Sequence, residues 1–364
     1  MIRILQIIFA VCAVLGGLDR IIGNRFGLGE RFETAFHLMG RTALSMAGII
    51  CLAPVLADVL GRVITPVYHF FRQDPGMFGC VLSIDMGGYQ MATRLADDAL
   101  VGRFAGIIAA SIMGCTLSFT IPVGMGMYEK NVQNRFARGI LYGIICIPPA
   151  ILVGALLCGI PFLTALWLCV PVTLLSLILV VALKKAPQAT LRAFSGFAFC
   201  LKVLTTIGLF IGVFQYMTGI ELIPGMTPVL EAMRIISIIA ITLLGVLPFS
   251  KILHWLLKKP MDWIGSKLKI GGNGVMAFFL FYLDSMPGLI ALPDLNPRGQ
   301  IAAAAAAVCA CSALSSHFAF TMACQSELTL PLLAAKLTGS VIAAALALMM
   351  TRNEPELAEG TGKK

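Results

Sequence analysis

Charged residues are scarce in this chain: they make up 12% of its 364 residues, whereas 59% are hydrophobic. A soluble globular domain usually has about a quarter of its residues charged and about half apolar. The scarcity excludes an ordinary soluble domain and indicates a membrane protein. The charges that are present sum to +9, but they fall mainly in short loops between apolar runs. That placement favours a role in membrane topology over nucleic-acid binding.

The chain also lacks the patterns on which enzyme and metal sites depend. It has four histidines, and its eleven cysteines form no Cys-x-x-Cys pair and have no histidine at metal-ligand spacing. The closest cysteines, Cys309 and Cys311, lie in an alanine-rich run, where small residues favour close helix packing. We find no nucleophile–base pair, phosphate-binding loop or redox motif. We therefore predict no enzymatic activity, no cofactor, no metal and no disulfide.

Several apolar runs are long enough to cross a membrane as helices. They are residues 2–18, 42–60, 104–127, 139–157, 163–183, 195–219, 234–250, 300–324 and 331–350. The first run has the composition of a signal peptide, but no small-x-small cleavage motif follows it, and we interpret it as a retained span. Lys202 and Lys336, near span ends, are expected to extend their ammonium groups to the membrane interface.

Two further apolar stretches, 77–96 and 273–292, each contain an acid followed by helix-breaking residues. The first includes Asp85-Met-Gly-Gly88, and the second includes Asp284-Ser-Met-Pro-Gly288. A carboxylate is costly in hydrocarbon, and glycine or proline releases the backbone from helical geometry. Broken backbone at membrane depth is tolerated where it is buried in protein or lines a polar cavity. We therefore predict two re-entrant hairpins, which in a transporter are the place for substrate.

The order of these features indicates an internal repeat. Pro54 and Pro66 are matched by Pro248 and Pro260, and each pair precedes one acid-bearing hairpin. The offset runs from 194 residues, between Pro54 and Pro248, to 199 residues, between Asp85 and Asp284. An odd number of crossings separates the copies, so they have opposite orientations. With the N-terminus outside and the C-terminus inside, most of the 27 lysines and arginines lie in the cytoplasm, as the positive-inside rule requires.

Together these features predict an all-α polytopic membrane protein. Its expected architecture is an inverted-repeat transporter fold with about nine to eleven membrane helices, including the two re-entrant hairpins. The predicted segments are an N-terminal span and cytoplasmic loop (1–41), repeat 1 (42–158), connecting spans (159–233), inverted repeat 2 (234–350) and a disordered tail (351–364). Residues 253–263 have the pattern of an interfacial amphipathic helix, although an ordinary loop is equally compatible with it.

Polar side chains in and near the hairpins are the predicted substrate-binding residues. Asp85 and Asp284 would pair with a cation, or each would cap a half-helix. Tyr89 and Tyr282 offer ring faces to an ammonium group, or pack against neighbours. His317 can exchange a proton, or it is a neutral hydrogen-bonded core histidine. The complete set is Asp85, Gly87, Gly88, Tyr89, Gln90, Ser118, Thr120, Tyr282, Asp284, Ser285, Ser316 and His317.

Several longer runs resemble the EutH family of bacterial ethanolamine permeases. They are Leu18–Ile21, Leu52–Gly61, Ile64–Tyr68, Pro75–Phe78, Asp85–Gly88, Phe119–Val123, Glu221–Gly225 and Gly339. The resemblance covers nearly the whole chain. It implies an inner-membrane protein that passes ethanolamine into the cytoplasm for ethanolamine utilisation, in contact with membrane lipid and without nucleic acid. Assembly as a homo-oligomer is compatible with such a carrier.

The chain departs from the family pattern at two places. An Asn-Asn pair is usual where this chain has Asp284-Ser285, and Gly-Asp-His is usual at Ser315-Ser316-His317. Our hypothesis is that the pocket keeps its net charge while relocating it. A divergent pocket can favour a related amino alcohol, so a related amine remains an alternative substrate. A carrier of the same architecture for another solute, such as a nucleoside, and a non-transporting docking or sensor protein also remain open. Uniport is physically sufficient, and sodium or proton coupling is not excluded.

Overall fold

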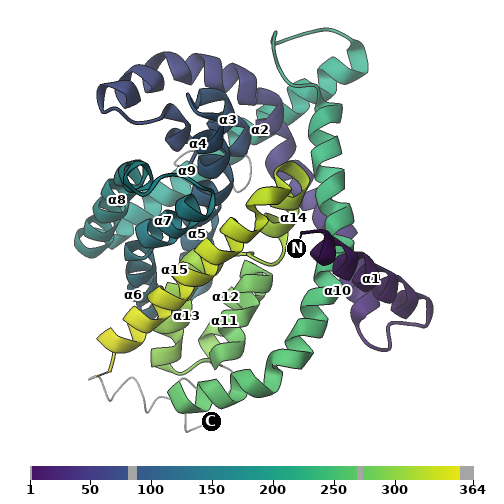
Figure 1. The fold of residues 1–364 in the computed structure, drawn as a ribbon, viewed down its shortest axis with the longest axis vertical. Helices are drawn as coiled ribbons and strands as arrows, with labels where there is room; N and C mark the ends of the chain where they lie inside the picture. Colours follow the sequence, from purple (N-terminus) through teal and green to yellow (C-terminus); the bar gives the residue numbers. More distant parts are fainter. Residues whose placement is uncertain (1, 81–87, 269–273, 353–364) are drawn as a thin grey trace. The chain divides into compact units, whose positions relative to one another are not determined.

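A computed structural model describes residues 2–80, 88–268 and 274–352, and every regular element within these ranges is a helix (Figure 1). Eight helical stretches of the described chain are long and apolar enough to cross a membrane. They are Arg3–Ile21, Leu28–Phe70, Ala99–Met127, Lys130–Leu157, Phe162–Lys185, Pro187–Thr218, Val229–Met261 and Ser326–Met350. Each contains one of the predicted apolar runs or nearly all of it. The predicted all-α polytopic class is therefore confirmed.

The predicted continuous span 300–324 is wrong. The chain forms α13 (Pro297–Ala310) and α14 (Ser316–Cys324), with a non-helical segment at residues 311–315 between them. Ser312 there has a positive φ of 50°. Hydropathy did not reveal the break because the segment is mostly apolar. Ser312, Ser315 and Ser316 lie in or beside it, and serine side chains compete with helical hydrogen bonds.

Several helices extend beyond their apolar runs. Helix α2 (Leu28–Phe70) continues through Pro54 and Pro66, and α10 (Val229–Leu268) includes the segment 253–263. That segment is helical, but it does not form a separate interfacial helix. The remaining long elements are α1 (Ile2–Ile21), α6 (Lys130–Ile145), α7 (Ile147–Leu157), α8 (Phe162–Lys185), α9 (Pro187–Thr218) and α15 (Thr329–Met350). The tail predicted to be disordered lies outside the described residues from position 353 onward.

The chain groups into two compact units, each assembled from distant segments. The first unit contains Met1–Gly114, Gly196–Ile252 and Leu314–Leu330, and the second contains Cys115–Ser195, Leu253–Ala313 and Pro331–Lys364. At two of the places where the chain leaves one unit for the other, the backbone departs from α-helical geometry. One is the π-helical stretch that includes Gly114, and the other is the break after α13.

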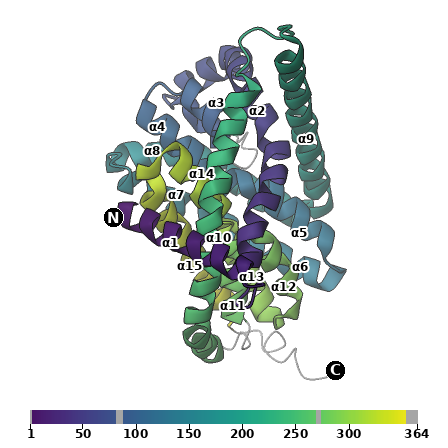
Figure 2. The same ribbon diagram turned by 90° about the vertical axis from the view of Figure 1, so that its right-hand side faces the viewer.

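Within the first unit, helices approach each other at glycines. A Cβ atom on Gly48 of α2 would lie 1.7 Å from the carbonyl oxygen of Thr205 in α9. A Cβ atom on Gly245 of α10 would lie 2.2 Å from the carbonyl oxygen of Phe9 in α1. Figure 2 shows α1 crossing α10. Small residues let the backbones of apolar helices approach closely. In lipid no hydrophobic effect drives helices together, and such close packing stabilises their association instead.

Within the second unit, α6 packs closely on α13. Cβ atoms on Gly139 and Gly143 of α6 would lie 2.3 Å from the Ile301 carbonyl oxygen and 2.4 Å from Cγ2 of Val308. The contact surface of α13 is a run of alanines that are fully buried. This alanine-rich helix is thus the core of the second unit, and it brings the break at residues 311–315 into the interior.

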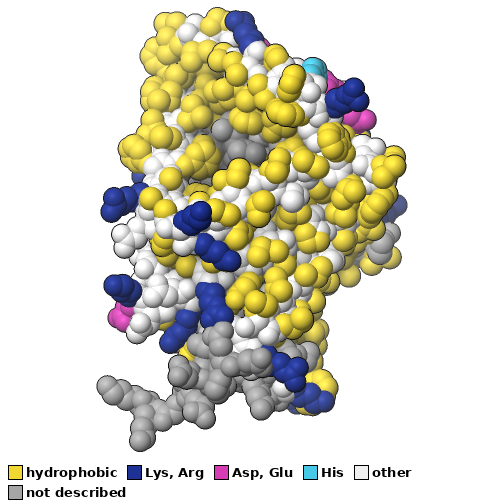
Figure 3. Space-filling view, turned by 90° about the vertical axis from the view of Figure 1, so that its left-hand side faces the viewer, with side chains coloured by type: hydrophobic (Ala, Val, Ile, Leu, Met, Phe, Trp, Pro, Cys, Tyr) yellow, Lys and Arg dark blue, Asp and Glu magenta, His cyan; other side chains and the backbone are white. Residues whose placement is uncertain are grey.

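Large hydrophobic side chains are exposed over much of the surface. Figure 3 shows a face covered mostly by hydrophobic side chains, with lysines and arginines at a few places. On α8, for example, Leu163 is 77% exposed and Ile178 is 62% exposed. Extended apolar surface of this kind marks a membrane or protein contact. Combined with the eight apolar helices, it fits a protein embedded in lipid.

Candidate functional site

Asp284 lies at a helix break, as the sequence predicted. Helix α11 (Gly274–Leu283) ends just before it, and α12 (Ser285–Ala291) begins just after it. Asp284 itself is extended, with φ −160° and ψ 138°. A Cβ atom on Gly288 would lie 2.6 Å from Cδ1 of Phe281, seven residues earlier. Residues seven apart in one straight helix are about 10 Å apart along its axis, so α12 turns back along α11 (Figure 1).

The Asp284 carboxylate caps the new helix. Its Oδ1 atom accepts a hydrogen bond from the Met286 N–H at 3.2 Å. This is the capping role that the sequence left as an alternative to substrate binding. An ionised carboxylate has about four acceptor positions, and the Met286 contact uses one of them. A carboxylate that caps a helix still carries the negative charge that a cation requires.

Two of the predicted hydroxyl residues converge on a cysteine. The Oγ atom of Ser285 lies 2.6 Å from Sγ of Cys311 and 3.2 Å from Oγ of Ser312. The Thr120 hydroxyl donates to the same Cys311 sulfur at 3.8 Å. Ser285 and Thr120 are both almost fully buried. The structure thus brings residues 120 and 285 together at the break that follows α13.

Thr120 belongs to an unusual helical stretch. The backbone is wound as π-helix in η2 (Ala105–Gly114) and η3 (Thr116–Thr120), before α5 (Ile121–Met127) resumes α geometry. Pro122 contributes to the change because it has no N–H to donate to the preceding turn. π-Helical turns occur frequently at functional sites. Ser118, also predicted, lies in η3 and is half-buried.

Lys336 and Tyr282 join the same region from α15 and α11. The Lys336 Nζ atom donates to the Cys311 carbonyl oxygen at 3.0 Å, and the side chain is 0% exposed. The expectation that Lys336 reaches the interface is therefore wrong. Tyr282 hydrogen-bonds Ser340, one turn further along α15. The sequence patterns did not indicate a role for Cys311 or Lys336 at this site. The two residues are 25 positions apart, and no local motif predicts a hydrogen bond from a lysine to a backbone carbonyl at that distance in the chain.

The other predicted residues of the described chain lie in the first unit. Helix α3 (Gly88–Leu95) begins at Gly88, with Tyr89 buried and Gln90 half-buried. The Tyr89 hydroxyl accepts a hydrogen bond from Gln325 Nε2 at 2.9 Å. Its ring meets Phe320 of α14 edge-on. Tyr89 thus packs against the helix that begins with Ser316 and contains His317, which is 1% exposed. Asp85 and Gly87 lie outside the described residues.

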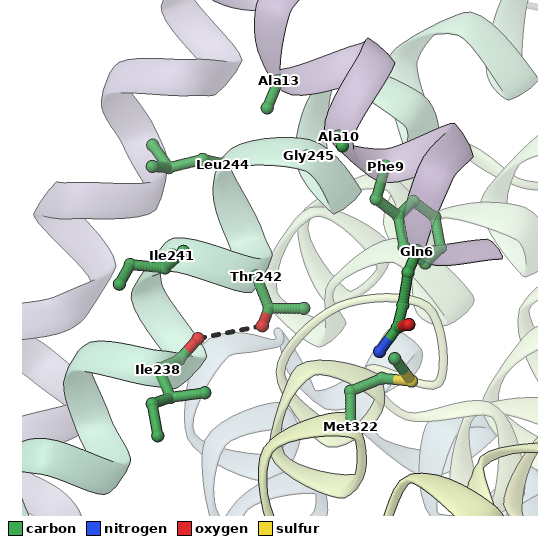
Figure 4. Close-up of a pocket in the computed structure, with 10 residues that line it drawn as sticks. All are labelled: Gln6, Phe9, Ala10, Ala13, Ile238, Ile241, Thr242, Leu244, Gly245 and Met322. Carbon is green, nitrogen blue, oxygen red and sulfur yellow. Dashed lines mark hydrogen bonds between the residues drawn. The ribbon is translucent and has the colours of Figure 1, made fainter. Parts of the chain in front are cut away.

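A cavity of about 380 Å³ in the first unit is lined mostly by apolar residues (Figure 4). Its lining comes from α1, α10 and Met322 of α14, and none of the predicted site residues that the structure describes contributes to it. The polar lining side chains are Gln6 and Thr242, and the Thr242 hydroxyl donates to the Ile238 carbonyl. Among the described residues that line it, none is charged, and these side chains offer an ammonium group no counter-charge.

The comparisons with known proteins agree with the resemblance in the sequence. The model of the family described as "Ethanolamine utilisation protein, EutH" matches residues 1–350. The chain belongs to the EutH family. It is 35% identical over 349 residues to a Listeria monocytogenes protein, covering 96% of this chain and 94% of that one. It is 32% identical over 380 residues to an Escherichia coli protein, covering 96% and 93% respectively.

Both of these relatives carry the name "Probable ethanolamine permease EutH". A Bacillus subtilis relative is 36% identical over 349 residues, covering 95% of this chain and 94% of its own length, and is named "Uncharacterized protein YxeR". No solved structure matches the chain. Membership of the family is shown over nearly the whole chain, and the names of the Listeria and Escherichia coli relatives describe a transporter rather than an enzyme.

Proposed function

We propose that this EutH family member is a permease that moves ethanolamine, as the protonated amine, into the cytoplasm. Two relatives that align over more than nine-tenths of their length are named probable ethanolamine permeases. The eight apolar helices supply a membrane body for such a carrier. The observation that carries the substrate class is the Asp284–Ser285 pair at the start of α12, an acid beside a hydroxyl at a helix break.

This pair matches the two ends of ethanolamine. The substrate has an ammonium group and a hydroxyl group separated by two carbons. Asp284 provides the negative charge for the ammonium group, with the ring of Tyr282 two residues away as a further partner for a cation. Ser285 and Thr120 provide hydroxyls that can donate to or accept from the substrate hydroxyl. Neither end of the molecule is then left without a polar partner when it leaves water.

The broken elements support a transporter architecture. We propose that α11 and α12 form a re-entrant hairpin. Its counterpart in an inverted repeat is the hairpin predicted over residues 77–96, of which 81–87 lie outside the residues that the structure describes. We further propose that the chain lies in the inner membrane with the N-terminus outside and the C-terminus inside. Transporters of this class bind substrate where discontinuous helices meet near the bilayer midplane. The break at 311–315 and the turn at Asp284 are two such discontinuities. They meet where Ser285 contacts Cys311.

A membrane potential is sufficient to drive this transport. One positive charge moving inward across an inside-negative membrane gains about 2.3 kcal/mol per 100 mV. A potential of roughly 100 mV therefore gives an accumulation of about fifty-fold at equilibrium. The carrier then needs no second solute to concentrate ethanolamine.

The test is uptake of labelled ethanolamine into proteoliposomes at an imposed inside-negative potential. Native protein is compared with Asp284→Asn, which removes the charge but keeps an oxygen able to cap α12. The matched control is Asp294→Asn, because Asp294 is exposed ten residues further on in η4 (Leu292–Asp294). We expect potential-driven uptake by the native protein and the control, and loss of uptake by Asp284→Asn.

Other outcomes separate the competing functions. Normal uptake by Asp284→Asn would remove Asp284 from the ammonium site and direct attention to Asp85. If the native protein takes up a related amine or a nucleoside instead of ethanolamine, the architecture stands and the substrate is wrong. If it moves none of these solutes, transport itself is rejected in favour of a docking or sensing role.

A further inference from the structure

Lys336 is buried at a place where a lysine is costly. Of the lysine and arginine side chains that the structure describes, only that of Lys336 is buried, and its exposure is 0%. It lies within α15, a helix long and apolar enough to cross a membrane. Ionisable residues inside membrane proteins are rare, and they generally pair with other side chains or with backbone carbonyls. The partner of its ammonium group therefore indicates what role this lysine has.

The ammonium group lies at the broken end of α13. Nζ donates at 3.0 Å to the carbonyl oxygen of Cys311, the residue that follows the last helical turn. Carbonyls at a helix C-terminus have no partner within the helix, and they hold the negative end of the helix dipole. The N–H of the next residue, Ser312, donates to the carbonyl of Phe281 at 2.9 Å, which ties the break to α11. A cation at this point offsets the partial negative charge of the carbonyl oxygen and of the helix dipole.

The neighbouring residues of α15 hold the lysine in place. A Cβ atom on Gly339 would lie 2.5 Å from Cβ of Ala150 in α7 and 2.7 Å from Sγ of Cys309 in α13. Ser340 bonds the hydroxyl of Tyr282 in α11. Residues 336, 339 and 340 lie on one face of a helix. This face is packed against three elements, so the lysine reaches the break from a tightly held position.

In transporters with discontinuous helices, unwound carbonyls and half-helix C-termini are the groups that coordinate the coupling sodium ion. We infer that the Lys336 ammonium group permanently takes the place of such an ion, and that the carrier therefore works without sodium. A tethered ammonium and a sodium ion both bring one positive charge to carbonyl oxygens. The inference rests on the proposed transport function and deepens it, because it assigns the carrier to sodium-independent uptake.

The experiment compares native protein with Lys336→Ala in sodium chloride and in N-methylglucamine chloride. N-methylglucamine is too large to enter a site vacated by an ammonium group. The control variant is Lys202→Met, because Lys202 is an exposed lysine of α9. Two readouts are used: uptake of labelled ethanolamine into proteoliposomes, and the melting temperature of the purified protein in detergent without substrate.

We expect the native protein and Lys202→Met to show the same uptake and the same melting temperature in both salts. Lys336→Ala should lose uptake by roughly tenfold or more in N-methylglucamine, because the Cys311 carbonyl is left buried without this cation. Sodium, or propylammonium as a replacement for the missing side chain, should raise its melting temperature and restore part of the uptake. Lys336→Arg, which keeps the charge, should remain insensitive to sodium.

Sodium-dependent uptake, or sodium stabilisation of the native protein, would overturn the inference. It would also be overturned if Lys336→Ala folds but responds to neither sodium nor propylammonium. If that variant does not fold, the native protein and Lys336→Arg still decide the matter by their response to sodium. The melting experiment contains no ethanolamine. A native protein that carries no ethanolamine would therefore reject the proposed function while leaving the role of Lys336 to be judged by the melting data.

Discussion

The sulfur atoms of Cys115 and Cys311 lie 2.9 Å apart, although 196 residues separate them in the chain. This separation falls within the 194-to-199-residue offset of the repeat predicted from sequence. Two positions related by a twofold rotation can touch each other only close to the rotation axis. In the inverted repeat proposed above, this cysteine pair therefore lies at the axis that relates the two copies, between the π-helical stretch and the break after α13.

The contact between these two thiols predicts a specific cross-link. A membrane-permeant oxidant such as iodine should join Cys115 to Cys311, since the sulfurs need to move less than about 1 Å to reach disulfide distance. Peptide mapping by mass spectrometry would detect the joined peptides, and Cys311→Ala should lack them. Cys200, exposed on α9, serves as an accessible thiol that reports whether the reagent has acted. Reaction at Cys200 with no joined peptide would contradict the contact.

Asp284 should contribute to stability through its cap as well as to transport through its charge. Asp284→Ala removes the oxygen that accepts from the Met286 N–H, and loss of such a cap typically costs about 1 kcal/mol. Asp284→Asn retains an accepting oxygen and should melt at a higher temperature than Asp284→Ala. Melting curves of the two purified variants make the comparison. Equal melting temperatures would mean that the cap contributes little.

The predictable parts of this molecule are those set by local sequence. The spans follow from apolar length, because hydrocarbon forces the backbone to satisfy its hydrogen bonds within helices. The break at Asp284 could be foreseen because an acid, a serine and a proline lie within four consecutive residues. Its capping bond spans two residues, so it could be anticipated as well.

The parts that could not be predicted depend on contacts between distant residues. The break at Cys311 has neither proline nor glycine beside it, and its serines are common in membrane helices. The partner of Lys336 is a backbone carbonyl, which leaves no signature in the sequence. Cys311 was interpreted as a packing residue because its neighbours Ser285, Thr120 and Cys115 come from other elements.

Glycines of α6 should be sensitive to the addition of one methyl group. Gly139→Ala places a Cβ atom 2.3 Å from the Ile301 carbonyl oxygen, a distance that requires α6 and α13 to separate. We expect a loss of about 1–3 kcal/mol in the free energy of unfolding. Gly40→Ala is the matched control in α2, because nothing lies within 4 Å of its added Cβ atom. Denaturant or thermal unfolding in detergent would measure both, and equal effects at the two positions would contradict this packing.

Asp74, in the connection before η1 (Pro75–Cys80), should make stability depend on pH. Burial raises the pKa of its carboxyl above the usual value, although the N–H groups of Asp98 and Gly76 donate to it and act in the opposite direction. A carboxyl with a raised folded-state pKa stabilises the fold below its unfolded pKa, and this contribution is lost as the pH rises through the folded pKa. The melting temperature of the native protein relative to Asp74→Asn should therefore increase as the pH falls from about 7 to about 4. A difference that stays constant, or decreases, would contradict the assignment.

Ser285 should determine whether the carrier distinguishes ethanolamine from ethylamine, which has the same ammonium group but no hydroxyl. Ser285 is 2% exposed and lies beside Asp284, so its hydroxyl is placed to bond the far end of an amine held by that acid. A site built to bond a substrate hydroxyl discriminates strongly against an analogue without one. Ser285→Ala should therefore reduce ethanolamine uptake by roughly tenfold, the effect of about 1.4 kcal/mol, while leaving ethylamine uptake nearly unchanged.

The control is Ser176→Ala, which removes the hydroxyl of a buried serine of α8 elsewhere in the second unit. Competition between the two labelled amines in proteoliposomes gives the ratio directly. An equal loss for both amines would show that Ser285 supports the break through Cys311 and does not bind the substrate hydroxyl.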